Sequence, residues 1–280
     1  MSSSSFSNAT LIVTGAASGI GRQIALQASE RGAEVIAADI NVKALQETRE
    51  IALNQGLRME VHELDVADKN AVHDFADGII PLLKGRKLIL VNNAGVGLLS
   101  GNFYHTSEED FEWLININLW GVIRMTKAFY PYFIQQNQGH IVNLSSVFGL
   151  GGFANQSAYC TSKFGVRGFT EAIRMELLGT HVHTTCVHPG GIKTNIVRSA
   201  IPKGSVTTAG MHEKAIVSFD KVARTTAEKA ARLILKAIEK KQQKLTIGQD
   251  AKAIDLITRL FPVAYTWIFK RQMDKAFKTS

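Results

Sequence analysis

The stretch Thr14-Gly15-Ala16-Ala17-Ser18-Gly19-Ile20-Gly21 decides the fold. It follows an apolar run at residues 10–14 and opens a helical pattern at residues 20–31, as expected for a strand, a turn and a helix. Glycines in such a turn let the backbone bend tightly and approach a pyrophosphate, which then lies at the positive end of the helix. A purely structural turn is the alternative, but the strand before it and the helix after it favour a dinucleotide site.

The same alternation of strand and helix continues along the chain. Further apolar runs lie at residues 34–38, 60–64, 88–91, 140–144, 183–187 and 244–247, and helical spacing occupies residues 42–55, 69–83, 108–136 and 159–178. This order predicts a parallel sheet covered by helices on both faces. We expect an α/β protein with one Rossmann-like, doubly wound domain over residues 1–249, about seven parallel strands, and a basic C-terminal helical extension over residues 250–280.

Asp39 ends the second apolar run, 24 residues after Gly15. That interval is close to the spacing of the acid that binds a ribose 2′-hydroxyl. A carboxylate would repel a 2′-phosphate, and neither Ser18 nor residues 40–42 offer a positive charge to offset it. The sequence therefore predicts NAD rather than NADP as the cofactor. A turn or N-cap role for Asp39 is the alternative.

Tyr159 and Lys163 are four residues apart, and helical spacing would place them on one face. A positive charge beside a phenol favours the phenolate and lowers a pKa that is ordinarily about 10. The pair therefore predicts a tyrosine general base, with a hydroxyl partner from the nearby Ser145-Ser146 pair. A half-buried tyrosine followed by a solvent-exposed lysine is the alternative.

Taken together, these motifs resemble those of the classical short-chain dehydrogenases/reductases. The turn matches that family's Thr-Gly-x-x-x-Gly-x-Gly, and residues 92–95 match its Asn-Asn-Ala-Gly motif. Ser146, Tyr159 and Lys163 match its Ser-Tyr-Lys set, including the interval of 13 residues between the serine and the tyrosine. The resemblance is colinear from residue 10 to residue 194, and beyond that it is only general.

The resemblance implies the roles of further residues. It implies a catalytic set of Asn118, Ser146, Tyr159 and Lys163, in which Asn118 holds a water against Lys163. It also implies that residues 65–66 contact the adenine and that the segment after the sixth strand closes on the nicotinamide. With the glycine turn and the acid at its side, the expected cofactor contacts are Gly15, Ser18, Gly19, Ile20, Gly21, Asp39, Asp65, Val66, Asn93, Ala94, Gly95, Tyr159, Lys163, Pro189, Gly190, Ile192 and Thr194.

The chemistry that follows is oxidation of an alcohol or reduction of a carbonyl by hydride transfer. The nicotinamide takes or gives the hydride, and Tyr159 takes or gives the proton as general base or acid. Lys163 and an oxidised nicotinamide would lower the pKa of Tyr159, while Ser146 would stabilise charge on the substrate oxygen. Two alternatives are an NAD(P)H-dependent carbonyl or acyl-chain reductase and a dinucleotide-binding regulatory protein without catalysis.

Three segments would surround a substrate at the carboxyl ends of the strands, at residues 96–104, 148–156 and 192–219. The first two carry no cluster of basic residues that would attract a phosphate or carboxylate. The third resembles a substrate lid, at about residues 194–220. We therefore expect a lipophilic secondary alcohol or ketone, such as a steroid, a retinoid or a long-chain alcohol, unless these apolar residues only pack the core.

Charge and cysteine content bound the remaining possibilities. Residues 1–220 have a charge balance of −1 and residues 221–280 a balance of +9, which together give the net charge of +8. Cys160 and Cys186 form neither a disulfide framework nor a metal spacing, so we expect no metal and a cytoplasmic, reducing compartment. We also expect a homodimer or homotetramer.

The basic C-terminal segment interleaves cations with apolar and aromatic residues from residue 251 to residue 277. Its uncharged run, residues 260–269, is too short to span a bilayer, but the pattern is typical of an interfacial segment. Peripheral membrane contact through residues 250–280 is one hypothesis. Packing on another subunit or over the pocket is the other, and nucleic-acid binding is disfavoured because the cations form no compact block.

Overall fold

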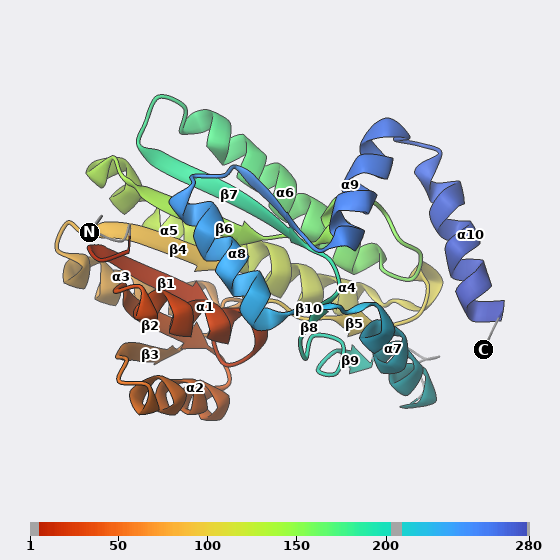
Figure 1. Ribbon diagram of the computed structural model, residues 1–280, viewed down its shortest axis with the longest axis horizontal. Helices are drawn as coiled ribbons and strands as arrows, with labels where there is room; N and C mark the ends of the chain where they lie inside the picture. Colours follow the sequence, from red (N-terminus) through yellow and green to blue (C-terminus); the bar gives the residue numbers. More distant parts are fainter. Residues whose placement is uncertain (1–5, 203–208, 279–280) are drawn as a thin grey trace.

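The computed structural model describes residues 6–202 and 209–278 of this 280-residue protein. Its centre is a seven-stranded parallel sheet in the order β11-β7-β6-β4-β1-β2-β3 (Figure 1). The strands are β1 (Ala9–Thr14), β2 (Glu34–Asp39), β3 (Met59–Glu63), β4 (Lys87–Asn92), β6 (Gly139–Leu144), β7 (Val182–Pro189) and β11 (Lys244–Ile247). The predicted Rossmann-like α/β fold with about seven parallel strands is confirmed.

The strand order reverses at β1. The chain runs outward from β1 through β2 to β3 and then returns to the other side of β1 to form β4. Connections on the two sides of this point leave in opposite directions, so a crevice opens at the carboxyl ends of β1 and β4. The glycine turn after β1 and the loop after β4 therefore meet at the same edge of the sheet.

Helices cover both faces of the sheet (Figure 1). One face packs against α1 (Gly19–Glu30), α2 (Val42–Asn54) and α8 (Ala227–Glu239). The other packs against α3 (Lys69–Ile79), α5 (Gly121–Gln136) and α6 (Ser157–Glu176). Successive strand residues point to opposite faces, so in β1 Leu11 and Val13 join the first core and Ile12 joins the second. Because both faces are covered, the central strands β1 and β6 are buried at every residue.

The predicted helix at residues 108–136 is interrupted. It consists of α4 (Glu108–Ile115), a π-helical turn η3 (Asn116–Trp120) and α5. Such turns insert an extra residue into a helix and are frequent at functional sites. Here the turn carries Asn118 with its side chain fully buried. Hydrophobic spacing on either side of the interruption is helical, which explains why the pattern alone predicts one continuous helix.

Shorter elements complete the carboxyl edge of the sheet. They are β5 (Leu98–Leu99) paired with β9 (Ile201–Pro202), β8 (Ile192–Lys193) paired with β10 (Thr225–Thr226), α7 (Ala209–Val222), and the 3-10 turns η2 (Phe103–His105) and η4 (Val147–Gly149). A further 3-10 turn, η1 (Ile80–Leu83), instead joins α3 to the start of β4. The predicted lid at residues 194–220 therefore contains β9 and the larger part of α7, while residues 203–208 of it lie outside the described residues.

Two helices follow β11 and form the predicted C-terminal extension. They are α9 (Gln249–Leu260) and α10 (Tyr265–Lys278), joined by a short turn (Figure 1). They lie beyond the carboxyl ends of the strands, on the same side of the molecule as α7 and β8. Within the described residues, none of the helices has both the length and the apolar character needed to cross a membrane.

Candidate active site

The glycine turn brings α1 into direct contact with the end of β1. Gly15 and Gly19 have φ angles of +68° and +54°, a region that side chains disfavour. A Cβ on Gly21 would lie 2.1 Å from the carbonyl oxygen of Gly15, so only glycine fits there. The amide of Asn93 donates to the carbonyl oxygens of Thr14 and Gly15, at 2.9 and 3.1 Å. The turn is thus held open in front of the N-terminus of α1, a geometry that fits a pyrophosphate.

Asp39 lies beside this turn at the end of β2. Its Oδ2 accepts a hydrogen bond from the backbone N–H of Ala17 at 2.9 Å, and its Oδ1 accepts one from Asn41 at 2.9 Å. Asn41, rather than Asp39, caps α2 by accepting from the N–H of Ala44. Asp39 therefore does not cap the helix, although its bond to the Asn41 N–H is the local turn contact that the other part of the alternative describes. Its carboxylate is held in place next to the glycine turn.

The loop after β4 is tied to the turn by Thr14, the last residue of β1. Its hydroxyl accepts from the backbone N–H groups of Asn93 and Ala94, both at 3.1 Å. Asn92, one residue earlier, instead points into the core and donates to Thr126 and Asn143. The two adjacent asparagines therefore have different tasks, one in the site and one behind it.

Ser146, Tyr159 and Lys163 converge at the other end of the same edge. Ser146 follows β6 and accepts from the N–H of Phe148 at 3.3 Å, which caps η4. Tyr159 and Lys163 lie on one face of α6, with the Lys163 Nζ 5.6 Å from the centre of the tyrosine ring. That Nζ donates to the carbonyl oxygen of Leu144 at 3.1 Å, so the buried ammonium is anchored to the end of β6.

Burial dominates the electrostatics of this group. It raises the pKa of Tyr159 to about 12, while the hydrogen bond with Ser146 acts in the opposite direction. Burial also lowers the pKa of Lys163 to about 8. The expectation that Lys163 brings the pKa of Tyr159 below its ordinary value is therefore wrong for the protein alone. The cost of removing the phenolate from water is the larger effect, and the ammonium is itself desolvated and bound to Leu144.

Asn118 is placed by the π-helical turn behind the loop after β4. Its Oδ1 accepts from the N–H of Val96 at 2.8 Å, and its Nδ2 donates to the carbonyl oxygen of Val96 at 2.9 Å. Gly95 lies between Asn118 and Lys163: a Cβ there would be 3.1 Å from the Asn118 Oδ1 and 3.5 Å from the Lys163 Nζ. Asn118 thus positions this loop, and the water that it would hold against Lys163 stays a prediction.

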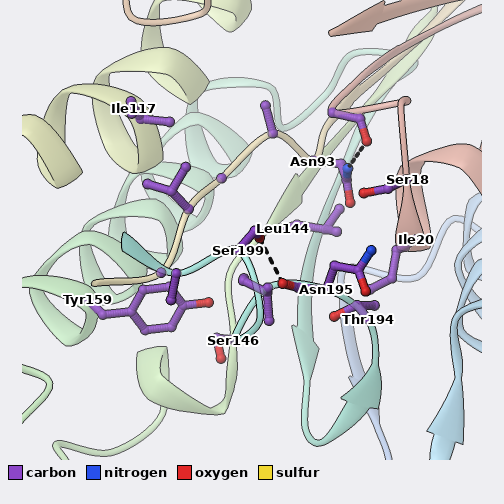
Figure 2. A pocket seen from close by; sticks show the side chains of 18 of the residues that line it. Ser18, Ile20, Asn93, Ile117, Leu144, Ser146, Tyr159, Thr194, Asn195 and Ser199 are labelled. Carbon is purple, nitrogen blue, oxygen red and sulfur yellow. Dashed lines mark hydrogen bonds between the residues drawn. The ribbon is translucent and has the colours of Figure 1, made fainter. Parts of the chain in front are cut away.

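One cavity of about 1140 Å³ connects the glycine turn to Tyr159. Figure 2 shows Asn93, Ser18 and Ile20 toward one end and Tyr159 and Ser146 toward the other. The predicted residues that line it are Gly15, Ser18, Gly19, Ile20, Asp39, Asp65, Val66, Asn93, Ala94, Gly95, Ser146, Tyr159, Lys163, Pro189, Gly190, Ile192 and Thr194. Gly21 and Asn118 lie behind this lining, where they support the turn and the loop.

Comparison with known proteins agrees with this arrangement. The sequence model of the family described as short chain dehydrogenase matches residues 9–204. The chain belongs to the short-chain dehydrogenase family. The match begins at β1 and extends past Thr194, so it covers every predicted site residue.

Relatives of this short-chain dehydrogenase cover between 70% and 98% of its length. It is 38% identical over 278 residues to SadH of Mycobacterium tuberculosis, a protein named as an oxidoreductase, with 98% of both chains covered. It is 36% identical over 196 residues to the 3-oxoacyl-[acyl-carrier-protein] reductase FabG of Thermotoga maritima, covering 70% of this chain and 79% of the other.

Two solved structures of similar fold differ in their cofactor. A short-chain dehydrogenase of Burkholderia phymatum in complex with NAD has a TM-score of 0.83 and 25% identity, covering 91% of this chain and 94% of that one. The closed form of a serine dehydrogenase complexed with NADP+ has a TM-score of 0.73 and 28% identity, covering 85% and 94%. Similarity in fold therefore does not distinguish NAD from NADP, and the preference must depend on the residues around Asp39.

The short-chain dehydrogenase fold also places residues in the site that the sequence analysis did not single out. Most of these residues lie in the segment after Thr194, where the sequence indicated only a variable apolar stretch. The additional lining residues are Trp113, Asn195, Ile196, Val197, Ser199, Ala200 and Phe219. The hydroxyl of Ser199 donates to the carbonyl oxygen of Asn195, which closes the turn after β8 (Figure 2).

The C-terminal helices contact two loops of the site. Asp250 Oδ2 accepts from the backbone N–H of Gly191 at 2.6 Å, in the segment expected to close on the nicotinamide. Tyr265 Oη accepts from the backbone N–H of Gly152 at 2.9 Å, in the apolar loop after η4. No sequence signal marks either contact, because the partners are 59 and 113 residues apart.

A continuous row of aromatic rings extends from Tyr159 to α10. Phe148 meets Tyr159 edge-on with 5.4 Å between ring centres, and Phe153 lies 4.5 Å from Phe148. Phe269 stacks on Phe153 at 5.1 Å and contacts Tyr265 at 5.3 Å. The wall beside Tyr159 is therefore supported from outside by the C-terminal helices, in agreement with the hypothesis that the extension packs over the pocket.

Proposed function

We propose that this short-chain dehydrogenase interconverts a lipophilic secondary alcohol and its carbonyl with NAD as the hydride carrier. The observation that carries the proposal is the single cavity that joins the glycine turn and Asp39 to Ser146, Tyr159 and Lys163. A dinucleotide bound along that cavity would bring its nicotinamide to the tyrosine end. The volume of about 1140 Å³ is larger than a small substrate alone requires.

The residues at the first end fit a dinucleotide. The turn and the N-terminus of α1 would bind the pyrophosphate, Asp39 a ribose hydroxyl, and residues 65–66 the adenine. When bound, the nicotinamide supplies a hydride acceptor or donor. The carboxylate of Asp39 disfavours a 2′-phosphate. Arg22, just past the turn, does not offset it, because its guanidinium donates to the carbonyl oxygens of Ala17 and Ala44.

At the second end, Tyr159 exchanges the proton and Ser146 binds the reacting oxygen. A pKa of about 12 keeps the Tyr159 hydroxyl protonated at neutral pH, which is the form that donates a proton to a carbonyl oxygen during reduction. In the reverse direction the same Oη accepts the alcohol proton as the hydride leaves carbon. The Ser146 hydroxyl donates to the substrate oxygen and stabilises its developing negative charge.

The substrate class rests on the lining of the tyrosine end. Among the described lining residues, the charged side chains are Asp39, Asp65 and Asp68 at the cofactor end and Lys163 in the catalytic group. The substrate end is lined instead by uncharged residues, most of them apolar, such as Leu98, Trp113 and Phe148, with polar ones such as Gln156 and Ser199 among them. An uncharged lipophilic substrate matches this surface because it leaves no charge without a partner.

Reduction of an acyl-chain ketone is a second candidate. The similarity to FabG of Thermotoga maritima, named as a 3-oxoacyl-[acyl-carrier-protein] reductase, favours it. The protonated resting state of Tyr159 is compatible with the same direction. Turnover of 3-oxoacyl thioesters with NADPH, in preference to secondary alcohols with NAD, would establish this candidate over the first.

The experiment that tests the proposal compares the wild type with Tyr159→Phe. We expect the wild type to reduce NAD with members of a panel of steroids, retinoids and long-chain secondary alcohols, measured by NADH absorbance. The variant keeps the ring but has no hydroxyl to exchange the proton, so its turnover should fall by roughly 100- to 10,000-fold. NADH binding, measured by fluorescence, should be retained. Near-normal turnover in the variant would refute the role of Tyr159.

A further inference from the structure

The outer face of the C-terminal hairpin, α9 and α10 with the turn between them, exposes a patch of large apolar side chains. Val263 and Trp267 are 77% and 72% exposed, and Leu260 is 63% exposed. Leu256, Phe261 and Ile268 extend the patch along both helices. Apolar groups gathered in this way favour transfer out of water, and such patches mark interaction surfaces.

Charges on the hairpin are segregated by sign. Both carboxylates within its described side chains face the body of the protein: Asp250 bonds the Gly191 N–H, and Asp255 pairs with Lys244 at 2.5 Å. The cations in the same part of the hairpin occupy exposed positions on both helices: Lys252, Arg259, Lys270 and Arg271. Arg259 lies 3.8 Å from Asp255 but keeps 72% of its side chain exposed. Over the described side chains, the hairpin therefore exposes large apolar residues together with cations.

The inner face of α10 packs against the body of the protein, which orients the exposed apolar face of the hairpin outward. Tyr265 and Phe269 point inward, where they contact Gly152 and Phe153. The aromatic row that ends at Tyr159 lies between α10 and the substrate end of the cavity. In Figure 1 the hairpin forms the edge of the molecule beyond the carboxyl ends of the strands.

We propose that this outer face binds the surface of an anionic lipid bilayer. Tryptophan, phenylalanine and leucine side chains enter the boundary between headgroups and acyl chains, while the exposed lysines and arginines are attracted by anionic headgroups. The hairpin lies on the membrane without crossing it, because its helices are too short and too polar for a span. Docking in this way turns the substrate end of the cavity toward the lipid.

The charge pattern selects this occupant over a second copy of the chain. Two identical hairpins related by a two-fold axis would place like-charged groups opposite one another, with their inward-facing carboxylates unavailable to offset them. An anionic lipid surface has the complementary charge. A dimer through the hairpin is therefore the competing outcome that the experiment must detect.

Vesicle co-sedimentation tests the apolar part of the proposal. Wild type should sediment with vesicles of phosphatidylcholine mixed with phosphatidylserine, and much less with phosphatidylcholine alone. Replacing Val263 and Trp267 together with serine should weaken binding at least about tenfold. Serine at Met175 and Leu178, which are equally exposed at the end of α6, is the matched control and should not change it.

A second pair of variants tests the basic part. Arg259→Glu with Arg271→Glu should reduce binding to the anionic vesicles at least about tenfold, since each cation near such a surface contributes about fivefold in affinity. Lys236→Glu with Lys240→Glu changes the net charge equally on α8, away from the hairpin, and should have little effect. Added salt should weaken wild-type binding.

Three results would overturn the proposal. The first is wild type that stays in solution with anionic vesicles, and the second is equal loss of binding in hairpin and control variants. The third is a wild-type dimer, measured by light scattering, that the Val263 and Trp267 variant converts to a monomer without vesicle binding in either protein. Retained melting temperature and NADH binding in each variant show that the fold is intact.

Discussion

The two ends of the cavity are built in different ways. At the cofactor end, the contacts join segments that directly follow β1, β2 and β4, through backbone groups and short polar side chains such as Thr14 and Asn93. At the substrate end, the wall beside Tyr159 depends on aromatic packing that reaches Phe269, near the end of the chain.

The difference shows how each end depends on the rest of the fold. A glycine turn between a strand and a helix carries its geometry in a few adjacent residues, so the sheet needs only to bring the turn and the loop after β4 together. The wall beside Tyr159 is not specified by a few adjacent residues in this way. Its shape depends on where a distant helix packs, and it can change without altering the cofactor end.

Acid should have the largest effect, and it should act through two buried histidines on β6 and β7. His140 on β6 and His188 on β7 are buried, and burial lowers their pKa values to about 3 and about 4. The unfolded chain binds protons below its ordinary histidine pKa of about 6.5 whereas the folded protein does not, so stability is full above that pH and falls as the pH decreases toward about 4. The free energy of unfolding should decrease by roughly several kcal/mol.

Urea unfolding between neutral pH and about pH 5 measures this loss. His140→Asn should make the decrease shallower, because a residue that cannot bind the proton replaces one that binds it only when unfolded. His73→Asn, at an exposed position on α3, serves as the control and should leave the slope unchanged. A stability that is constant over this range would contradict the prediction.

Gly21→Ala should damage the cofactor end alone. The added Cβ would lie 2.1 Å from the Gly15 oxygen and 2.6 Å from the Asn93 Nδ2, so the turn must move. Strain of roughly 1–3 kcal/mol should weaken NADH binding by up to about 100-fold in a fluorescence titration. Gly78→Ala on α3 adds a methyl group in open space and should bind NADH normally. Unchanged binding in Gly21→Ala would show that the turn tolerates a side chain.

Phe269→Ala should affect the substrate end alone. It removes the ring that stacks on Phe153 and so releases the support of the wall beside Tyr159. We expect kcat/KM for a lipophilic substrate to fall about tenfold, with the NADH dissociation constant unchanged. Trp267→Ala, on the exposed side of the same helix, should keep normal kinetics with a water-soluble substrate. A parallel loss of NADH affinity would show that the two ends are not independent.

Asp39→Asn should have the smallest effect. It removes the charge at the cofactor end while keeping an oxygen that can accept from the Ala17 N–H. The ratio of kcat/KM with NADP to that with NAD should rise about fivefold, corresponding to roughly 1 kcal/mol between partly exposed charges. A wild type that already prefers NADP would contradict the role given to Asp39.

Much of the fold and of the candidate site could be predicted from patterns of adjacent residues. The seven strands lie within one or two residues of their apolar runs, and the glycine turn, the loop after β4 and the Ser-Tyr-Lys set line one cavity. Two expectations needed correction. The helix predicted over residues 108–136 contains a π-helical turn, and the pKa of Tyr159 is raised, since spacing along a helix carries no information about burial.

The sequence by itself determined the fold class, the dinucleotide turn and the family. Each of these depends on residue types at fixed intervals, which set local backbone geometry and the side of an element on which a residue lies. Only the tertiary structure decided that Asp250 bonds the loop after β7, that Tyr265 and Phe269 support the substrate wall, and that the opposite face of their helix is exposed. These contacts join residues far apart in the chain, and packing alone brings them together.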